Sequence, residues 1–212
     1  ISGVSPISGV HYQNGKIYIT TEIAPDMLAL IIDLSGNIIS AKRILSSYTS
    51  FASAIMHDGD LLITTSYNVT DGSIEITRLT PAFTTVFSKR ILFQNRDFVY
   101  VDDIKQIGDR IYFGGSARLR SNQLTGRWFF GALDLNGNLI YLNEYEVENT
   151  DPYPNNHFVS MDSIGPDHIV AAGYASDLSG SGALNSFIDG VLVKIQASDG
   201  SVVDRLIFSP QN

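Results

Sequence analysis

One five-residue unit recurs almost unchanged along this chain. Ala41-Lys42-Arg43-Ile44-Leu45 returns 47 positions later as Ser88-Lys89-Arg90-Ile91-Leu92, with four identical residues in five. Both copies close the same series of a turn, an apolar segment of strand length, a second turn and a return segment. Self-similarity at a period of this size is the signature of a repeat architecture, so this recurrence constrains the fold more than any other feature.

The unit belongs to a pattern that occurs four times. Segments rich in β-branched and aromatic residues begin at Ile17, Leu61, Ile111 and Ile169, at spacings of 44, 50 and 58 residues. Such segments are typical of strands, and turn dipeptides such as Asn14-Gly15 separate them. No segment has sustained helical periodicity, so the pattern predicts an all-β protein.

Two all-β folds fit short strands with glycine turns. A β-sandwich has turn signals every 8–12 residues, whereas propeller blades of four strands give periods of the size seen here. A β-sandwich does not require the turn, the strand and the Lys-Arg-Ile-Leu unit to recur in one fixed order. We therefore predict a β-propeller-like domain of four tandem repeats, each of about four antiparallel strands, covering residues 1–46, 47–94, 95–147 and 148–212.

Specific segments carry a resemblance to known repeats. Gly15–Thr21 with Asp33-Leu34-Ser35-Gly36-Asn37, and Gly108–Gly114 with Asp134-Leu135-Asn136-Gly137-Asn138, are the best matches, and Asp189–Gly200 matches the third-strand portion. This pattern resembles the loosely defined β-propeller repeats of bacterial and archaeal exported proteins. The resemblance implies a propeller scaffold and no specific activity.

The chain departs from the named propeller classes. It has no Trp-Asp dipeptide, the double glycine Gly114-Gly115 of kelch-like repeats occurs once, and Trp128 is the single tryptophan. Four repeats also raise a question of closure, because an open fan leaves sheet edges and an apolar face exposed. Either the four blades close on themselves, or a longer chain or self-association completes a larger ring. The chain begins with Ile1, which indicates a removed leader or a segment of a longer chain.

Composition excludes several classes of function. Lys and Arg number 14 against 22 Asp and Glu, and a net charge of −8 argues against a nucleic-acid partner. The absence of cysteine excludes disulfides, thiolate zinc sites and a cysteine nucleophile. The longest apolar run, Met27–Ile32, is too short to span a membrane. The four histidines are dispersed and three lie near first turns, so we expect them to be solvated, with no metal and no cofactor.

We expect the binding face to be built from the longer loops, which follow the second strands and connect the blades. Arg118, Arg120 and Arg127 form a basic cluster in one loop, and Tyr153 and His157 belong to another that combines polar and aromatic groups. Such groups suit protein or glycan partners. The alternative is that they are solvated loop residues without a partner.

Three carboxylates fall on first strands, which line the central axis of a propeller. Asp102, Asp103 and Asp162 could raise one another's pKa or bind a cation, or they could point into water. A glycosidase would need two of them at a suitable separation.

The features together favour a non-enzymatic recognition or structural module. We expect it outside the cell, or on a cell or virion surface, binding protein or glycan through its long loops; the sequon Asn68-Val69-Thr70 fits that location. One alternative is a polysaccharide-acting enzyme that uses the axial carboxylates. Another is a self-associating subunit of a virion or surface filament.

Overall fold

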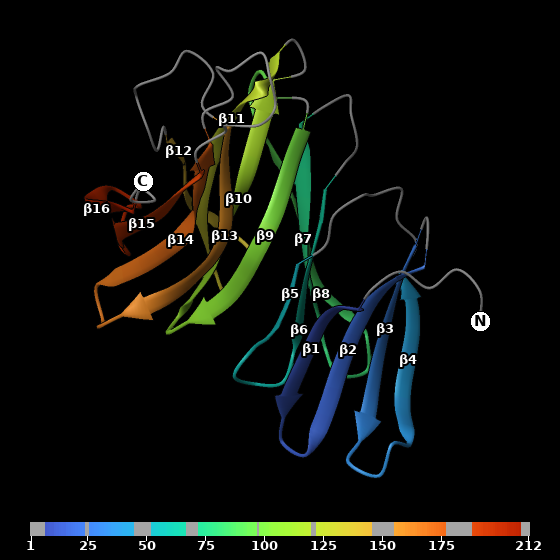
Figure 1. Cartoon of the computed structure of the whole chain (residues 1–212). Coiled ribbons are helices and arrows are strands. Elements are labelled where there is room, and N and C mark those ends of the chain that lie inside the picture. The colour runs from blue at the N-terminus through green and yellow to red at the C-terminus, as the bar shows by residue number, and fades with distance from the viewer. Residues whose placement is uncertain are drawn as a thin grey trace.

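Four antiparallel sheets, numbered here as blades 1 to 4, make up the computed structural model of the chain (Figure 1). The structure describes residues 7–23, 26–44, 52–66, 72–96, 98–119, 122–145, 155–176 and 188–208. This part of the chain contains no helix, and therefore none that could cross a membrane. The prediction of an all-β, propeller-like fold with four repeats is confirmed. The assignment of the chain to one domain stays a prediction.

Each blade is a meander of four strands in chain order, and blades 3 and 4 are joined by one parallel pair between Gly126 and Asn155. Blade 1 consists of β1 (Ile7–Gln13), β2 (Lys16–Ile23), β3 (Asp26–Asp33) and β4 (Ile38–Ile44). Blade 2 consists of β5 (Ser53–Ile55), β6 (Leu61–Ser66), β7 (Ser73–Leu79) and β8 (Thr85–Leu92). Blade 3 consists of β9 (Phe98–Ile107), β10 (Arg110–Leu119), β11 (Asn122–Asp134) and β12 (Leu139–Tyr145). Blade 4 consists of β13 (Asn155–Ile164), β14 (His168–Ser176), β15 (Ile188–Gln196) and β16 (Val202–Phe208).

The turn motifs act as local scaffold. Asn14 and Gly15 have φ of 51° and 74°, as a tight hairpin turn with two left-handed residues requires. The Asp-Leu-x-Gly-Asn motif uses its aspartate to close the turn: Asp134 Oδ1 accepts bonds from the backbone N of Asn136 and Asn138, and Oδ2 accepts one from Asn138 Nδ2. Asp33 makes the same three bonds in blade 1.

These turn aspartates predict an acid-sensitive contribution to stability. Bonds from the Asn138 side chain and backbone hold the pKa of Asp134 below its ordinary value. A depressed pKa stabilises the folded state above the unfolded-state value, and that contribution is lost as the pH falls through the folded-state value. Asp134→Asn should therefore melt below the wild type at neutral pH, with the difference shrinking in acid. Asp109→Asn, in a neighbouring turn, is the control, and a difference independent of pH would contradict this account.

Three apolar cores hold the fan together, one between each pair of neighbouring blades. Residues that alternate along the strands supply them, because successive side chains point to opposite faces of a sheet. Between blades 1 and 2 the core contains Tyr18, Met27, Ala29, Ile31, Leu61, Ile63, Leu79 and Phe83. Between blades 2 and 3 it includes Leu62, Ile74, Ile76, Ile91, Ile111, Phe113, Phe129 and Leu133. Between blades 3 and 4 it includes Tyr112, Trp128, Phe130, Phe158, Ile169, Ala171, Val191 and Val193.

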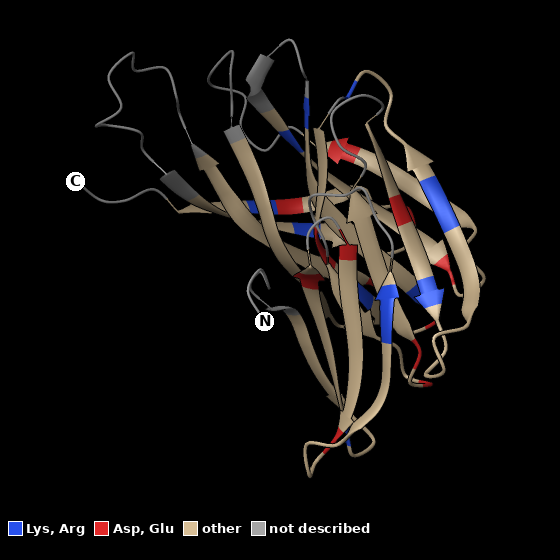
Figure 2. Cartoon of the chain, turned by 90° about the vertical axis from the view of Figure 1, so that its right-hand side faces the viewer, with Lys and Arg blue, Asp and Glu red and all other residues tan. Residues whose placement is uncertain are grey.

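The recurring Lys-Arg-Ile-Leu unit is also structural. Of its isoleucines, Ile44 packs on the core between blades 1 and 2, and Ile91 belongs to the core between blades 2 and 3. Arg43 pairs with Asp26 at the start of β3, and Arg90 donates to Ser73 at the corresponding position of β7. Charged residues of both signs occur on several strands of the fan, as Figure 2 shows.

The structure corrects one expectation about the loops. Residues 118–127 were expected to form a long loop, but β10 extends to Leu119 and β11 begins at Asn122. The insertion in blade 3 therefore lengthens a hairpin. Similarly, His157 lies in β13 and not in a loop.

Candidate functional site

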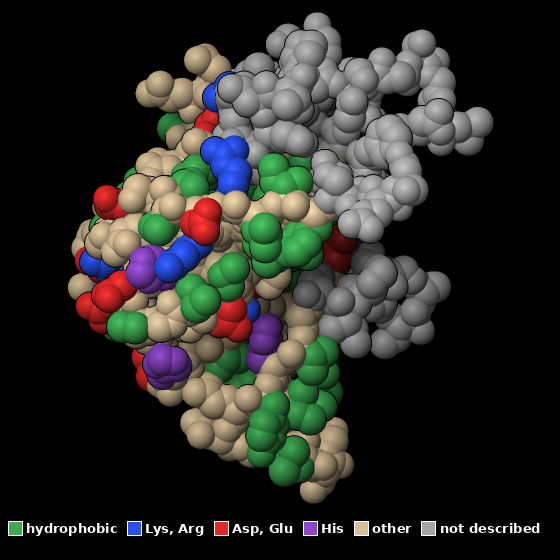
Figure 3. Space-filling model, turned by 60° about the vertical axis from the view of Figure 1, so that its left-hand side comes forward, with side chains coloured by type: hydrophobic (Ala, Val, Ile, Leu, Met, Phe, Trp, Pro, Cys, Tyr) green, Lys and Arg blue, Asp and Glu red, His purple; other side chains and the backbone are tan. Residues whose placement is uncertain are grey.

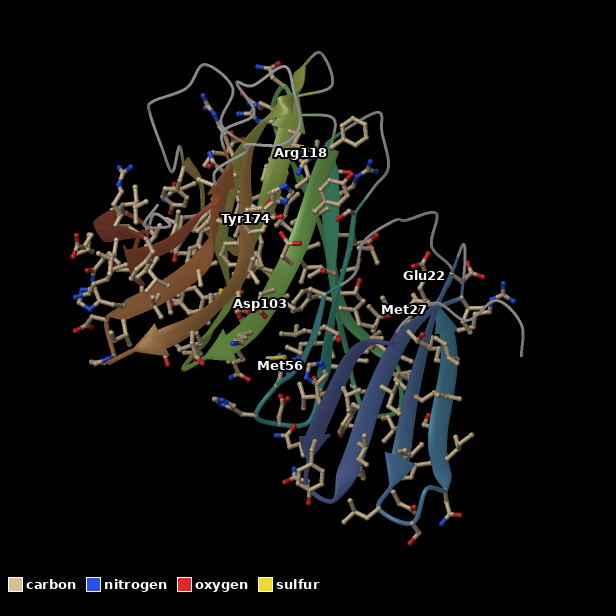
Figure 4. The ribbon with its side chains drawn as sticks, in the orientation of Figure 1. Glu22, Met27, Met56, Asp103, Arg118 and Tyr174 are labelled. Atoms are coloured by element: carbon tan, nitrogen blue, oxygen red, sulfur yellow. The ribbon has the colours of Figure 1, made fainter. Side chains whose placement is uncertain are left out.

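The first strands of neighbouring blades pack side by side and form the inner wall of the fan. Figure 4 shows Arg118 and Tyr174 near one end of this wall and Asp103 farther along β9. The turns at the opposite end are short. Polar side chains gather in two places on the wall, which we call the wall cluster (Asp102, Ser116, Arg118, His157 and Tyr174) and the axial pocket (His11, Ser53, Asp103, Lys105 and Asp162).

A β-bulge in β9 places Asp102. Asp103 is opposite Gly114 and Val101 is opposite Gly115, so Asp102 is an extra residue without a partner across the ladder. The strand can bend here because residue 115 is glycine: an added Cβ would lie 1.8 Å from the Tyr100 carbonyl oxygen. Bulges re-aim side chains next to functional sites. Irregularities at the same level of β1 and β13 show that the bulge recurs around the wall.

Asp102 has the most perturbed carboxyl group of the wall. Its side chain reaches solvent, yet the concave wall surrounds it with protein atoms, and this desolvation raises its pKa to about 7. A hydrogen bond with Ser116 and the charge of Arg118 oppose the shift, while the nearby Asp103 adds to it. A carboxyl group with such a pKa holds a proton in about half of the molecules at neutral pH.

Asp103 lies beside it in a contrasting environment. Its Oδ2 accepts hydrogen bonds from Ser160 Oγ and Met161 N, both at 2.9 Å. Lys105 Nζ lies 3.6 Å from Asp103 and 3.9 Å from the exposed carboxylate of Asp162. Asp103 therefore ties β9 to β13, because it accepts the backbone N–H of Met161.

Arg118 connects blades 3 and 4 across the wall cluster. It donates to the ring of His157, which stacks on Tyr174 with centroids 4.8 Å apart. Burial, and then the Arg118 charge, lower the pKa of His157, so its ring is neutral and can accept this bond. Arg118 Nε is buried and has no hydrogen-bond partner among the described residues.

The axial pocket is a cavity of about 790 Å³ between the first strands of all four blades. Within it His11 Nε2 lies 3.0 Å from Ser53 Oγ, which lies 2.8 Å from Thr20 Oγ1. Burial lowers the pKa of His11, although a bond with the Ser53 backbone and the charge of Asp103 oppose the shift. The expectation that His11 is solvated in a turn is therefore wrong: it is a half-buried residue of β1.

The structure brings together residues that the sequence assigned to different faces. Asp102 was expected at the axis and Arg118 and His157 on a separate loop face, yet all three belong to the wall cluster. Arg127 is opposite Ala117 in the hairpin, so it lies on the sheet face away from Arg118. Arg120 and Tyr153 lie outside the described residues. The expected ligand-binding role of these residues stays a prediction.

Sequence reasoning missed five polar residues of the wall: His11, Ser53, Lys105, Ser116 and Tyr174. Lys105 could have been found, because it follows Asp103 by two positions and a strand places such residues on one face. The others depend on contacts between blades, which no local pattern reports. Among the described residues, no group of three or more His, Asp or Glu side chains is close enough to hold a metal ion.

Comparison with solved structures finds propeller enzymes. The chain superposes with a TM-score of 0.68 on the α-L-arabinofuranosidase Arb93A from Fusarium graminearum, at 11% identity over 98% of this chain and 66% of that one. An α-L-arabinanase from Penicillium chrysogenum, complexed with arabinobiose, gives 0.60 at 13% identity over 98% and 70%. A protein of unknown function from Bacteroides caccae gives 0.60 at 10% identity over 99% and 69%. No protein-family model and no curated protein matches the chain.

These likenesses establish the fold, and the chain spans about two thirds of the length of the first two enzymes. They contradict the prediction of a non-enzymatic recognition or structural module, because the similar structures include enzymes named for acting on arabinose-containing glycans. The alternative prediction, a polysaccharide-acting enzyme, is the one that they favour.

Proposed function

We propose that this chain forms the catalytic wall of a glycoside hydrolase, with Asp102 as the proton donor. One observation carries the proposal: a carboxyl group with a pKa of about 7 lies on the concave wall beside an ion-paired carboxylate, Asp103. Glycoside hydrolysis requires two carboxyl groups near the scissile bond, one of which gives a proton to the leaving oxygen, and a carboxyl group with a raised pKa suits that role. The likeness to glycan-acting enzymes supports the same class of substrate.

The wall supplies the groups for the reaction. Protonated Asp102 gives its proton to the glycosidic oxygen as the bond to the anomeric carbon breaks. A second carboxyl group, that of Asp103 or Asp162, either activates water or attacks the anomeric carbon, depending on its separation from Asp102. Arg118 and the His157–Tyr174 pair would bind sugar hydroxyls and a sugar face. An extracellular location fits a polysaccharide substrate and stays a prediction.

The direct test is release of reducing ends from arabinan, arabino-oligosaccharides and a panel of other polysaccharides. We expect hydrolysis of at least one arabinose-containing substrate, with a rate that falls as the pH rises through about 7, because Asp102 must be protonated to act as the acid. A folded protein without activity on any glycan of the panel would refute the proposal.

A further inference from the structure

The two ends of the fan expose sheet faces that are equivalent to buried faces elsewhere in the molecule. In the described part of the chain no strand of blade 1 packs against a strand of blade 4. The open face of blade 1 comprises Val10, Tyr12, Ile17, Ile19, Leu30 and Ile32. The open face of blade 4 contains the apolar residues Val170, Ala172, Leu192, Leu206 and Phe208, and the register places Tyr174, Lys194 and Asp204 on the same face. Figure 3 shows hydrophobic side chains gathered over blade 1.

Equivalent positions in the other three blades show which kind of surface the open face of blade 1 is suited to contact. Ile17 lies near the start of β2, at the position that Leu61, Ile111 and Ile169 occupy in the second strands of the other blades. Those three residues are almost fully buried, and each faces the preceding blade. Val10 and Tyr12, beside Ile17, are instead 58% and 66% exposed. The open face of blade 1 is therefore a blade-binding surface without a preceding blade.

The open face of blade 4 is the complementary surface. Val170 occupies the position of Tyr18, Leu62 and Tyr112, which are buried against the following blade. Leu206 and Phe208 on the same face are 55% and 51% exposed. Contiguous exposed apolar patches mark interaction sites in soluble proteins. In blades 1 to 3 the equivalent face packs against the following blade. Among the described residues, blade 4 has no following blade to cover this face.

We propose that the open face of blade 1 binds the open face of blade 4 in a second copy of this chain. The contact continues the three blade-to-blade interfaces already present within the molecule. It is head-to-tail, since a different surface of each copy takes part, and such contacts generate closed rings or open chains according to their rotation.

Paired variants test this arrangement by light scattering over a range of concentrations. Val10→Asp with Ile38→Asp alters blade 1, where Ile38 is opposite Ile32 of the open face. Leu206→Asp with Phe208→Asp alters blade 4, and all four residues are about half exposed or more. Val86→Asp is the control, because Val86 is 49% exposed and lies on blade 2, outside both faces. The wild type and the control should exceed the mass of 23.2 kDa as concentration rises. Each double variant alone should stay monomeric.

Mixing the two double variants gives the decisive result. Each variant keeps one intact face, so the mixture should form one-to-one dimers and nothing larger. A wild type that stays monomeric at the highest concentration overturns the proposal. Association of either double variant by itself overturns it as well, since that would show a contact between like faces or at another surface. So does a mixture that remains monomeric.

Discussion

Replacing Asp102 by Asn is expected to lower glycan hydrolysis by a factor of about 100 or more, the usual contribution of a positioned acid. The amide has nearly the shape of the carboxyl group but cannot give up a proton to the leaving oxygen. The remaining slow activity should also lose its decline above a pH of about 7, because the group that causes it is absent. The measurement is kcat for the wild type and the variant across the pH range, on a substrate that the wild type cleaves.

Stability provides the control for this variant. A carboxyl group whose pKa is raised on folding destabilises the folded state as the pH rises from its unfolded value, near 4, to about 7. Asp102→Asn should therefore melt no lower than the wild type at neutral pH, although its activity is lost. Asp109→Asn, an exposed turn substitution in the same blade, should change neither quantity. Equal activity in wild type and Asp102→Asn would remove Asp102 from the mechanism.

Replacing Gly173 by Ala is expected to destabilise the protein by about 3 kcal/mol, at the upper end for overpacking. An added Cβ would lie 2.1 Å from the His157 carbonyl oxygen and 2.4 Å from the Trp128 ring. The backbone at the β13 bulge cannot withdraw easily, and Trp128 is fully buried between blades 3 and 4. A shift of either would also disturb His157, and with it the wall cluster.

Gly190→Ala is the matched control, because Gly190 is opposite Tyr174 on the adjoining strand and has no atom nearer than 3.8 Å to its added Cβ. We expect it to be neutral or to stabilise by up to about 1 kcal/mol through the unfolded chain. Urea unfolding of both variants gives the comparison. Failure of Gly173→Ala to fold would agree with the prediction, whereas equal stability of the two variants would contradict the packing described for Trp128.

The double glycine of blade 3 shows how far local pattern could lead. Gly114-Gly115 looked like a fragment of a repeat signature. In the structure, Gly114 makes room for the ring of Phe158, and Gly115 admits the Tyr100 carbonyl at the bulge. Gly173 in blade 4 corresponds to Gly115, because it admits the His157 carbonyl at the bulge of β13. The glycine pair therefore marked the position of the bulge in the sequence. The reason for glycine there is the close approach of atoms from other strands, which only the structure shows.

The amino-acid sequence by itself determined the strands, the turns and the fourfold repetition. These depend on neighbours within a few residues, such as the Asp-Leu-x-Gly-Asn turn, and on the alternation of apolar side chains. Only the tertiary structure decided which polar groups meet. The register of β9 projects Asp102, and the packing of blade 4 on blade 3 brings His157 to Arg118. Within the described ranges, blades 1 and 4 each also have one sheet face against which no other blade packs. Contacts between residues about 40 positions apart or more depend on how blades pack, and no local pattern encodes that packing.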